Sequence, residues 1–563
     1  MNSKVHHPFT KIFIPICLFL LVIFVGITLA PSIGPAWDEP DNIFSGGQYW
    51  NFFQSGFKPS ILTQKDAGAS IFGNIIYTQE HDLARYPPVP NYIGTAFAVI
   101  AARFGMPMTG PNVIIAFHIA TVFFFAILVV TVYAFGELLG LSIAVRLFAA
   151  LAIFLYPTMF GHGLSDLKDT AQVALFTLSL YLLLRSLLTG MSERRPPETA
   201  NPCTIIGAIV WGLALATKFN AVYVPVIAGI WVVCTGLLEF VKHNPKNSVH
   251  VKPFVAAAGT IIIYMVIGFA VAFIVWPYLW FDPTHRIVEV VRYFTTVGQG
   301  YQIFWNGTLY QVGVGRSLWW YPWANLFLAT PIVVLFAIGL GLLQGAAAIF
   351  QKNPGNRMPL LLFLWILIPL ARAIMPSAAF YDGIRHFMEV LPPLMLLAAL
   401  GVEVFVHVLH KKFFVPLLPD YRVTLLCCYF VTLLTIIGYL IFIDINYVPY
   451  SSGYFNAFAV NPNIQYDRDI EALSVHEAMQ YLDANYPPSR VWVPIAGHLS
   501  WYYLKAGDQY VYNSGEADSI VLVNKSSHFS EKEFVATLGG AYVPVYSVTR
   551  QGAIFAWVFR KKE

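Results

Sequence analysis

The sequence predicts a polytopic α-helical membrane protein with a small α/β domain at its C-terminal end. Of its 563 residues, 57% are hydrophobic and 11% are charged, whereas an average soluble domain has about 25% charged residues. Several apolar stretches reach about 18 residues or more, enough to cross roughly 30 Å of hydrocarbon as a helix. The apolar pattern ends near residue 445 and a mixed polar segment follows. We therefore expect a membrane domain over 1–445 and a separate domain over 446–563.

The apolar stretches give about eleven candidate spans. They lie at about 12–30, 112–136, 143–161, 171–189, 203–217, 221–241, 254–277, 323–349, 359–376, 387–408 and 423–445. We expect the first stretch to remain as an uncleaved helix, because no convincing small-residue cleavage site of a signal peptide follows it before Trp37.

Lysine and arginine predict the orientation of the spans. If the N-terminus is cytoplasmic, the short cytoplasmic loops carry the excess of positive charge that the positive-inside rule requires. These loops hold Arg194, Arg195, Lys242, Lys246, Lys252, Lys352, Arg357, Lys411, Lys412 and Arg422. An odd number of spans then places the C-terminal domain outside the cytoplasm. We expect a multi-pass protein of the plasma (inner) membrane with its working face on the extracytoplasmic side.

Three segments on the predicted outer face are too long to be simple connections. They are 31–111, which includes an amphipathic stretch over 44–57, then 278–322, and the C-terminal domain. Segments of this size on one face usually build a site or bind a partner. The C-terminal domain reads as α/β, with a helix at 475–485, strands at 490–495 and 519–523, a helix near 530–538 and a hairpin over 542–559.

An acidic motif follows the first span directly. Trp37-Asp38-Glu39-Pro40-Asp41 places two adjacent carboxylates, those of Asp38 and Glu39, at the membrane exit. Ionisable groups at that depth lose hydration and need partners, which makes them functional candidates. The alternative is structural, because Asp38 could cap a short helix over 41–50.

A second acidic group lies where the third span meets the fourth. The segment from Gly161 to Thr170 contains Asp166, Lys168 and Asp169. Asp169 could cap the fourth span, because a carboxylate at a helix N-terminus is stabilised by the helix dipole. A functional role is the alternative, because the same face presents Asp38 and Glu39.

Basic residues reach the predicted outer face singly and close to the membrane. Arg85 precedes Tyr86, Lys218 lies in a tight turn between two spans, and Arg385 and His386 follow Tyr381. The positive-inside rule disfavours cations on that face. Salt bridges to the acids or snorkelling at the interface would explain them. Convergence on a lipid-linked phosphate is the sharper explanation.

These motifs together resemble the GT-C superfamily of membrane glycosyltransferases. The resemblance rests on the acidic pair after the first span, Lys168-Asp169, Thr217-Lys218, and Arg385 before a span that contains Pro392-Pro393. The branches that the chain resembles are the protein O-mannosyltransferases and the aminoarabinose transferases that modify lipid A. The segment from Tyr450 to Asn456 is also similar to bacterial members. The C-terminal domain does not match the soluble domains of protein O-mannosyltransferases.

The resemblance implies inverting transfer of a sugar from a polyprenyl-phosphate donor to an acceptor hydroxyl of a lipid, glycan or protein. A carboxylate must take the proton of the hydroxyl. The resemblance suggests Asp38 for that role, with Glu39 orienting it or contacting the sugar and Asp169 shaping the site; Asp166 is an alternative to Asp169. The substrate-binding candidates are Arg85, Tyr86, Lys168, Lys218, Tyr381, Arg385 and His386. Cations on the phosphate make a catalytic metal unnecessary, although the clustered acids leave a divalent ion open.

Several features exclude other classes. The net charge of +4 is distributed along the chain and does not indicate nucleic-acid binding. The five cysteines lie in or beside apolar spans and show neither a disulfide framework nor a metal-binding spacing. No glycine-rich nucleotide fingerprint follows the predicted strands, which favours a donor delivered from the membrane. A lipid or solute transporter remains the rival outside enzymes; the lack of internal repeats and the gathering of charges at one face weigh against it. Within the superfamily, a ligase or oligosaccharyltransferase is the other rival.

Overall fold

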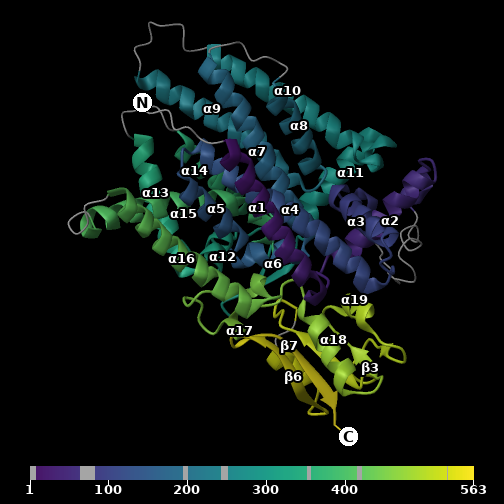
Figure 1. The fold of residues 1–563 in the computed structure, drawn as a ribbon. Helices are drawn as coiled ribbons and strands as arrows, with labels where there is room; N and C mark the ends of the chain where they lie inside the picture. The colour runs from purple at the N-terminus through teal and green to yellow at the C-terminus, as the bar shows by residue number, and fades with distance from the viewer. Residues whose placement is uncertain are drawn as a thin grey trace.

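The chain folds as a helical bundle with a small sheet at one end. The structure, a computed structural model, describes residues 8–63, 83–193, 201–242, 252–350, 357–414, 421–528 and 531–562. Figure 1 shows the C-terminal sheet beyond one end of the bundle, next to α6 and α16. The predicted fold class, a polytopic α-helical membrane protein with a small C-terminal sheet region, is confirmed.

The helices of the first half lie at the following positions. They are α1 (Pro8–Leu29), α2 (Glu39–Gln54), α3 (Val89–Arg103), α4 (Gly110–Leu138), α5 (Ile143–Phe154), α6 (Pro157–Ser165), α7 (Leu167–Glu193), α8 (Pro202–Leu215), α9 (Tyr223–Lys242) and α10 (Lys252–Ile274). Helix α4 packs against α1, α3, α5 and α7. It therefore lies inside the bundle, with Phe117 and Phe125 fully buried.

The second half adds a hairpin and the remaining bundle helices. They are α11 (Pro283–Thr296), the hairpin β1 (Gln302–Trp305) and β2 (Thr308–Gln311), α12 (Trp320–Ala329), α13 (Ile332–Phe350), α14 (Met358–Ala371), α15 (Leu391–Leu409) and α16 (Tyr421–Tyr447). Helices α13 and α15 touch through glycines: a Cβ added at Gly341 would lie 1.8 Å from the carbonyl oxygen of Leu397. Small residues allow this close approach of backbones inside a membrane.

The eleven predicted spans each overlap an apolar helix. Within the described ranges, eight helices are long and apolar enough to cross a membrane, and α5 with α6 forms a further candidate bent by 62°. The remaining two, α8 and Met358–Ile374, are apolar but shorter. One prediction needs correction: the stretch 323–349 is not a single helix. Thr330 is extended and Pro331 follows it, so that α12 ends and α13 begins as a separate helix.

The cations that predicted the orientation are only partly described. Arg194, Arg195, Lys246 and Lys352 lie outside the described residues. The amphipathic stretch predicted over 44–57 falls largely within α2, where Tyr49 and Phe52 are fully buried. Helix α11 exposes Ile287, Val288 and Val291.

The C-terminal region contains a five-stranded mixed sheet. Its elements are α17 (Pro462–Gln465), α18 (Ser474–Asn485), β3 (Arg490–Trp492), α19 (Gly497–Ser500), β4 (Gln509–Tyr510), β5 (Ser519–Val523), α20 (Glu531–Thr537), β6 (Tyr542–Arg550) and β7 (Ala553–Lys561). The strand order is β4-β3-β5-β7-β6, with β3 parallel to β4 and β5 and with β7 antiparallel to β5 and β6. The sequence predicts all of these strands except the two-residue β4, which is too short to show a periodic pattern.

Candidate active site

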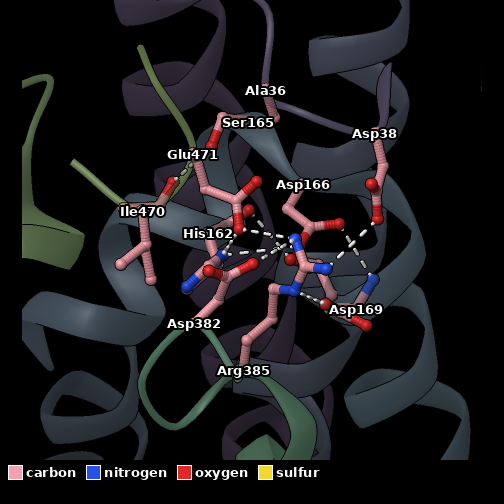
Figure 2. A network of polar contacts seen from close by, with 12 residues as sticks. Ala36, Asp38, His162, Ser165, Asp166, Asp169, Asp382, Arg385, Ile470 and Glu471 are labelled. Atoms are coloured by element: carbon pink, nitrogen blue, oxygen red, sulfur yellow. Dashed lines mark hydrogen bonds and ion pairs between the residues drawn. The ribbon is translucent and has the colours of Figure 1, made fainter. Parts of the chain in front are cut away.

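A single buried arginine joins acids from distant parts of the chain. The Arg385 guanidinium lies 3.0 Å from Glu471 Oε1, 3.3 Å from Asp38 Oδ2, 3.4 Å from Asp169 Oδ2 and 3.7 Å from Asp382 Oδ2. Its side chain is only 4% exposed. Figure 2 shows the guanidinium between these carboxylates, which come from the start of α2, the start of α7, the loop before α15 and the C-terminal region.

Further cations and acids complete this group of charges. Lys168 Nζ lies 2.9 Å from Asp38 Oδ2, Lys218 pairs with Asp169, and Lys525 Nζ lies 2.9 Å from Asp382 Oδ1. We call the whole group the Arg385 cluster, and it consists of Asp38, His162, Asp166, Lys168, Asp169, Lys218, Asp382, Arg385, Glu471 and Lys525. Acids and cations nearly balance, as buried charges require.

Asp38 is the most accessible acid of the Arg385 cluster. Its side chain is 29% exposed, whereas those of Asp166, Asp169, Asp382 and Glu471 are 8% exposed or less. Burial would raise the pKa of Asp38, but the positive charges of Lys168 and Arg385 outweigh that effect and hold the pKa well below its usual range.

The capping role considered for Asp38 is not what the structure shows. Asp38 occupies the N-cap position of α2, yet its side chain makes no hydrogen bond to the helix. The carboxylate binds Lys168 and Arg385 instead.

Asp166, and not Asp169, caps α7. The backbone N–H of Asp169 donates to Asp166 Oδ1 over 3.1 Å. The carboxylate of Asp169 lies between Lys218 and Arg385. Of the two roles considered for Asp169, the capping one thus belongs to Asp166, because the loop between α6 and α7 brings the earlier aspartate onto the free N–H group.

Glu39 faces away from the Arg385 cluster. Its Oε2 accepts a hydrogen bond of 3.1 Å from the backbone N–H of Ala36 and lies 3.1 Å from His118 Nε2 on α4. The side chain is 3% exposed. Glu39 thus fixes the backbone that leads into Asp38, and the structure does not bring it into contact with the cations.

The loop before α15 carries three of the predicted site residues. Asp382 and Gly383 both have positive φ angles, 55° and 67°, which turns the chain sharply and precedes the inward-facing Arg385. Tyr381 lies under Arg385, with 5.8 Å between the guanidinium carbon and the ring centre, and contacts the ring of His386 at 4.6 Å. Tyr381 and His386 therefore border the Arg385 cluster.

Arg85 and Tyr86 lie outside the cluster, against α11. The guanidinium carbon of Arg85 is 4.5 Å from the ring centre of Tyr293, and the hydroxyl of Tyr86 hydrogen-bonds to that of Tyr293. Burial raises the pKa of Tyr86 well above its ordinary value, and the hydrogen-bonded Tyr293 and the nearby carboxylates of Asp38 and Asp41 add to the effect.

Sequence reasoning missed the two contributions of the C-terminal region. Glu471 supplies the shortest contact to Arg385. Lys525 is 3% exposed and donates a hydrogen bond of 2.8 Å to the carbonyl oxygen of Ile470. Its Nζ lies 4.4 Å from the ring centre of Trp37. Two signals could have found them: the charged run from Asp467 to Glu471 soon after the last span, and the lone lysine that follows the apolar strand β5.

One subset of the Arg385 cluster offers donor atoms that could hold a metal ion. One ligand atom each from His162, Asp166 and Glu471 lies within 4.8 Å of the other two. His162 Nδ1 lies 3.4 Å from Asp166 Oδ2, and Nε2 has no hydrogen-bond partner. One imidazole and two carboxylates suit a divalent cation. An ion there would compete with Arg385, which lies 3.0 Å from Glu471.

Comparison with known proteins confirms the fold. No protein-family model and no curated protein matches the chain. The archaeal oligosaccharyltransferase AglB from Archaeoglobus fulgidus, in complex with an inhibitory peptide and a dolichol-phosphate, matches with a TM-score of 0.51 and 11% identity over 98% of this chain and 74% of that chain. ArnT from Cupriavidus metallidurans bound to undecaprenyl phosphate matches with a TM-score of 0.44 and 12% identity over 98% of both chains. The chain is a multi-pass membrane protein with the GT-C fold, as its sequence resemblance predicted.

Proposed function

We propose that the protein is a glycosyltransferase that moves a sugar from a polyprenyl-phosphate donor to an acceptor hydroxyl of a lipid, glycan or protein. The observation that carries the proposal is Asp38, the most accessible acid of the Arg385 cluster, in contact with Lys168 and Arg385. A base for the hydroxyl and cations for a phosphate thus lie side by side. The shared fold with AglB, described in complex with a dolichol-phosphate and a peptide, supports the same class of donor.

The reaction needs one proton acceptor and a stabilised leaving group. The acceptor oxygen attacks the anomeric carbon of the donor sugar as the bond from that carbon to the phosphate oxygen breaks, which inverts the configuration. The proton of the hydroxyl passes to Asp38. The lipid phosphate leaves with the bonding electron pair, and the cations stabilise its added negative charge.

Two lysines are reachable for a phosphate. The side chains of Lys168 and Lys218 are 20% and 18% exposed, whereas Arg385 is 4% exposed. We assign Lys168 to direct contact with the donor phosphate, and Arg385, which is buried, attracts the phosphate through its charge; Lys218 is held by Asp169 beside them. Tyr381 and His386 border this site and would shape it.

Donor binding would activate Asp38. In the free protein, Lys168 and Arg385 lower the pKa of Asp38 and make it a weak base. A phosphate that binds Lys168 next to Arg385 offsets the positive charge of both cations, so the pKa of Asp38 rises toward its ordinary value. The base therefore becomes effective when the donor is in place.

Arg85, Tyr86 and Glu39 act outside the reacting centre in this proposal. Arg85 and Tyr86 both contact Tyr293, which is a residue of α11. Helix α11 also exposes an apolar face. We assign them to the path of the lipid chain. Glu39 positions Asp38 through the backbone of Ala36.

The proposal requires no metal ion, because the cations supply the positive charge that the leaving phosphate needs. We therefore expect transfer to be unchanged by EDTA. Loss of activity with EDTA and recovery with Mn²⁺ would instead assign a catalytic ion to His162, Asp166 and Glu471.

Mass spectrometry of glycolipids and glycoproteins from a deletion strain tests the function. We expect one glycoconjugate to lose a single sugar residue, to regain it with the wild-type gene, and not to regain it with Asp38→Asn. Unchanged glycoconjugates together with altered uptake or export of a solute would favour the transporter.

A further inference from the structure

A pocket adjoins the Arg385 cluster on the side of the C-terminal region. The space in and around it amounts to about 450 Å³, part of which is open solvent. Its walls come from α6, the β1–β2 hairpin, α12, the loop before α15 and the segment 452–470. The pocket and the cluster share two stretches of chain. Gly383 and Ile384 line the pocket between Asp382 and Arg385, and Ile470 lines it directly before Glu471.

One wall of the pocket is aromatic and firmly held. The ring centre of Trp305 lies 4.8 Å from that of Tyr466 and 5.4 Å from that of Tyr321, with interplanar angles of 74° and 76°. An isolated β-bridge joins Trp305 to Tyr466, and the N–H of Gly307 donates to the carbonyl of Gln465 over 3.1 Å. The hairpin is thus fixed against the C-terminal region, and the rings are ordered before a ligand arrives.

Polar groups accompany the aromatic rings. Asp467, Asn325 and Thr158 all line the pocket. Asp467 is fixed by the N–H of Ser527, which donates to its Oδ1 over 2.9 Å. Thr158 is 3% exposed, and its hydroxyl has no hydrogen-bond partner. Because a buried hydroxyl without a partner is costly, this group is ready to bond to a ligand.

The composition of the pocket selects a neutral ligand with hydroxyl groups. The described lining residues include Asp467 but neither lysine nor arginine, so the pocket repels a phosphate, which the cations of the Arg385 cluster attract. Aromatic faces cover the C–H groups of a sugar ring, while a carboxylate, an amide and a hydroxyl bond to its hydroxyl groups. Small-molecule sites in general have mostly apolar walls and a few polar groups at fixed positions.

We propose that this pocket binds a pyranose ring next to the reacting centre, with Trp305 and Tyr466 against its apolar face and Asp467, Asn325 and Thr158 on its hydroxyl groups. The proposal rests on the proposed glycosyl transfer and adds to it the place of a sugar. The ring belongs either to the donor or to a glycan acceptor, since both present the same chemistry.

Binding of simple glycosides to the purified full-length protein tests the pocket without an acceptor. Methyl α-D-mannopyranoside, methyl β-D-glucopyranoside and methyl β-D-galactopyranoside would be assayed by saturation-transfer NMR. We expect at least one to bind the wild type and to lose about tenfold in affinity in Trp305→Leu. Trp323→Leu is the matched control, because Trp323 lies on α12, is 41% exposed and does not line the pocket. Equal binding to Trp305→Leu, or no binding of any glycoside to the wild type, would overturn the proposal.

Two further measurements keep the result interpretable. Asp467→Asn provides a second variant if Trp305→Leu does not fold, and it should also weaken glycoside binding. Undecaprenyl phosphate binding, measured in parallel, should be unchanged in these variants; its absence in the wild type would refute the proposed donor and leave the glycoside result intact. In a transfer assay, Trp305→Leu should raise the KM of the donor if the pocket holds the donor sugar. It should raise the KM of the acceptor if the pocket holds a glycan acceptor. If neither KM rises, the assignment of the pocket is overturned.

Discussion

Neutralising Arg385 should destabilise the protein as well as inactivate it. The guanidinium lies within 3.7 Å of four carboxylates. Asp38, Asp169 and Asp382 each keep a lysine partner when Arg385 is lost. Glu471 is 1% exposed, and among the described residues its other ionic neighbour is His162 at 4.0 Å. The cost of Arg385→Gln therefore falls mainly on Glu471.

Removal of one member of a buried ion pair costs about 3–5 kcal/mol, because the remaining charge is left uncompensated. We expect Arg385→Gln to lower the free energy of unfolding by about this amount. Glu471→Gln should cost less, since Arg385 keeps three carboxylates. The double variant should be more stable than Arg385→Gln alone, because it removes the carboxylate that Arg385→Gln leaves unpaired.

Unfolding by SDS in mixed micelles, followed by tryptophan fluorescence, measures these differences. The double-mutant cycle then gives the coupling between the two residues, about 0.5–3 kcal/mol for groups in contact. Arg490→Gln is the matched control, because Arg490 forms an exposed pair with Asp518, and ion pairs on the surface contribute little to stability. A stable Arg385→Gln that shows no coupling to Glu471→Gln would refute the buried pair, and with it the contribution of the C-terminal region to the site.

Three further outcomes are expected. Lys168→Gln should weaken binding of a polyprenyl-phosphate sugar by roughly ten- to a hundredfold, since a charge-assisted hydrogen bond contributes about 1.5–3 kcal/mol; Lys505→Gln is the control, and unchanged binding to Lys168→Gln would remove Lys168 from the donor site. The acid limb of kcat should lie at higher pH than that of kcat/KM, because the pKa of Asp38 is depressed in the free protein and rises when the donor phosphate shares its cations; coincident limbs would contradict this activation. A cysteine at Tyr512, which is 76% exposed, should react with an impermeant maleimide in intact cells, whereas one at Lys411 should react only after permeabilisation; the opposite pattern would reverse the orientation.

The spans were predictable because the length and the apolar composition of a stretch determine whether it can cross a membrane as a helix. Pro331 also indicates the break between α12 and α13. A prediction from hydrophobicity alone misses it, because the residues on both sides of the proline are apolar. Five charged residues were predictable in the same way, because they lie at the ends of spans on one predicted membrane face. They are Asp38, Lys168, Asp169, Lys218 and Arg385, and the structure brings them together.

The remaining features of the site depend on tertiary contacts that spacing does not encode. Asp166 and Asp169 lie three residues apart, and only the path of the loop decides which one caps α7. Glu39 neighbours Asp38 in sequence but turns to His118. Glu471 contacts Arg385 and Lys525 contacts Asp382 because the C-terminal region packs against the bundle. We found no sequence motif that predicts this packing.

Transfer by purified Asp38→Asn tests the central claim most directly. Wild type, Asp38→Asn and the surface control Asp483→Asn would be compared for transfer of label from a pool of polyprenyl-phosphate sugars to a membrane extract. Loss of a general base costs on the order of 10²–10⁴ in rate. The account predicts a loss of that size for Asp38→Asn, with folding and undecaprenyl phosphate binding retained and with Asp483→Asn as active as the wild type. Near-normal transfer by well-folded Asp38→Asn would contradict it.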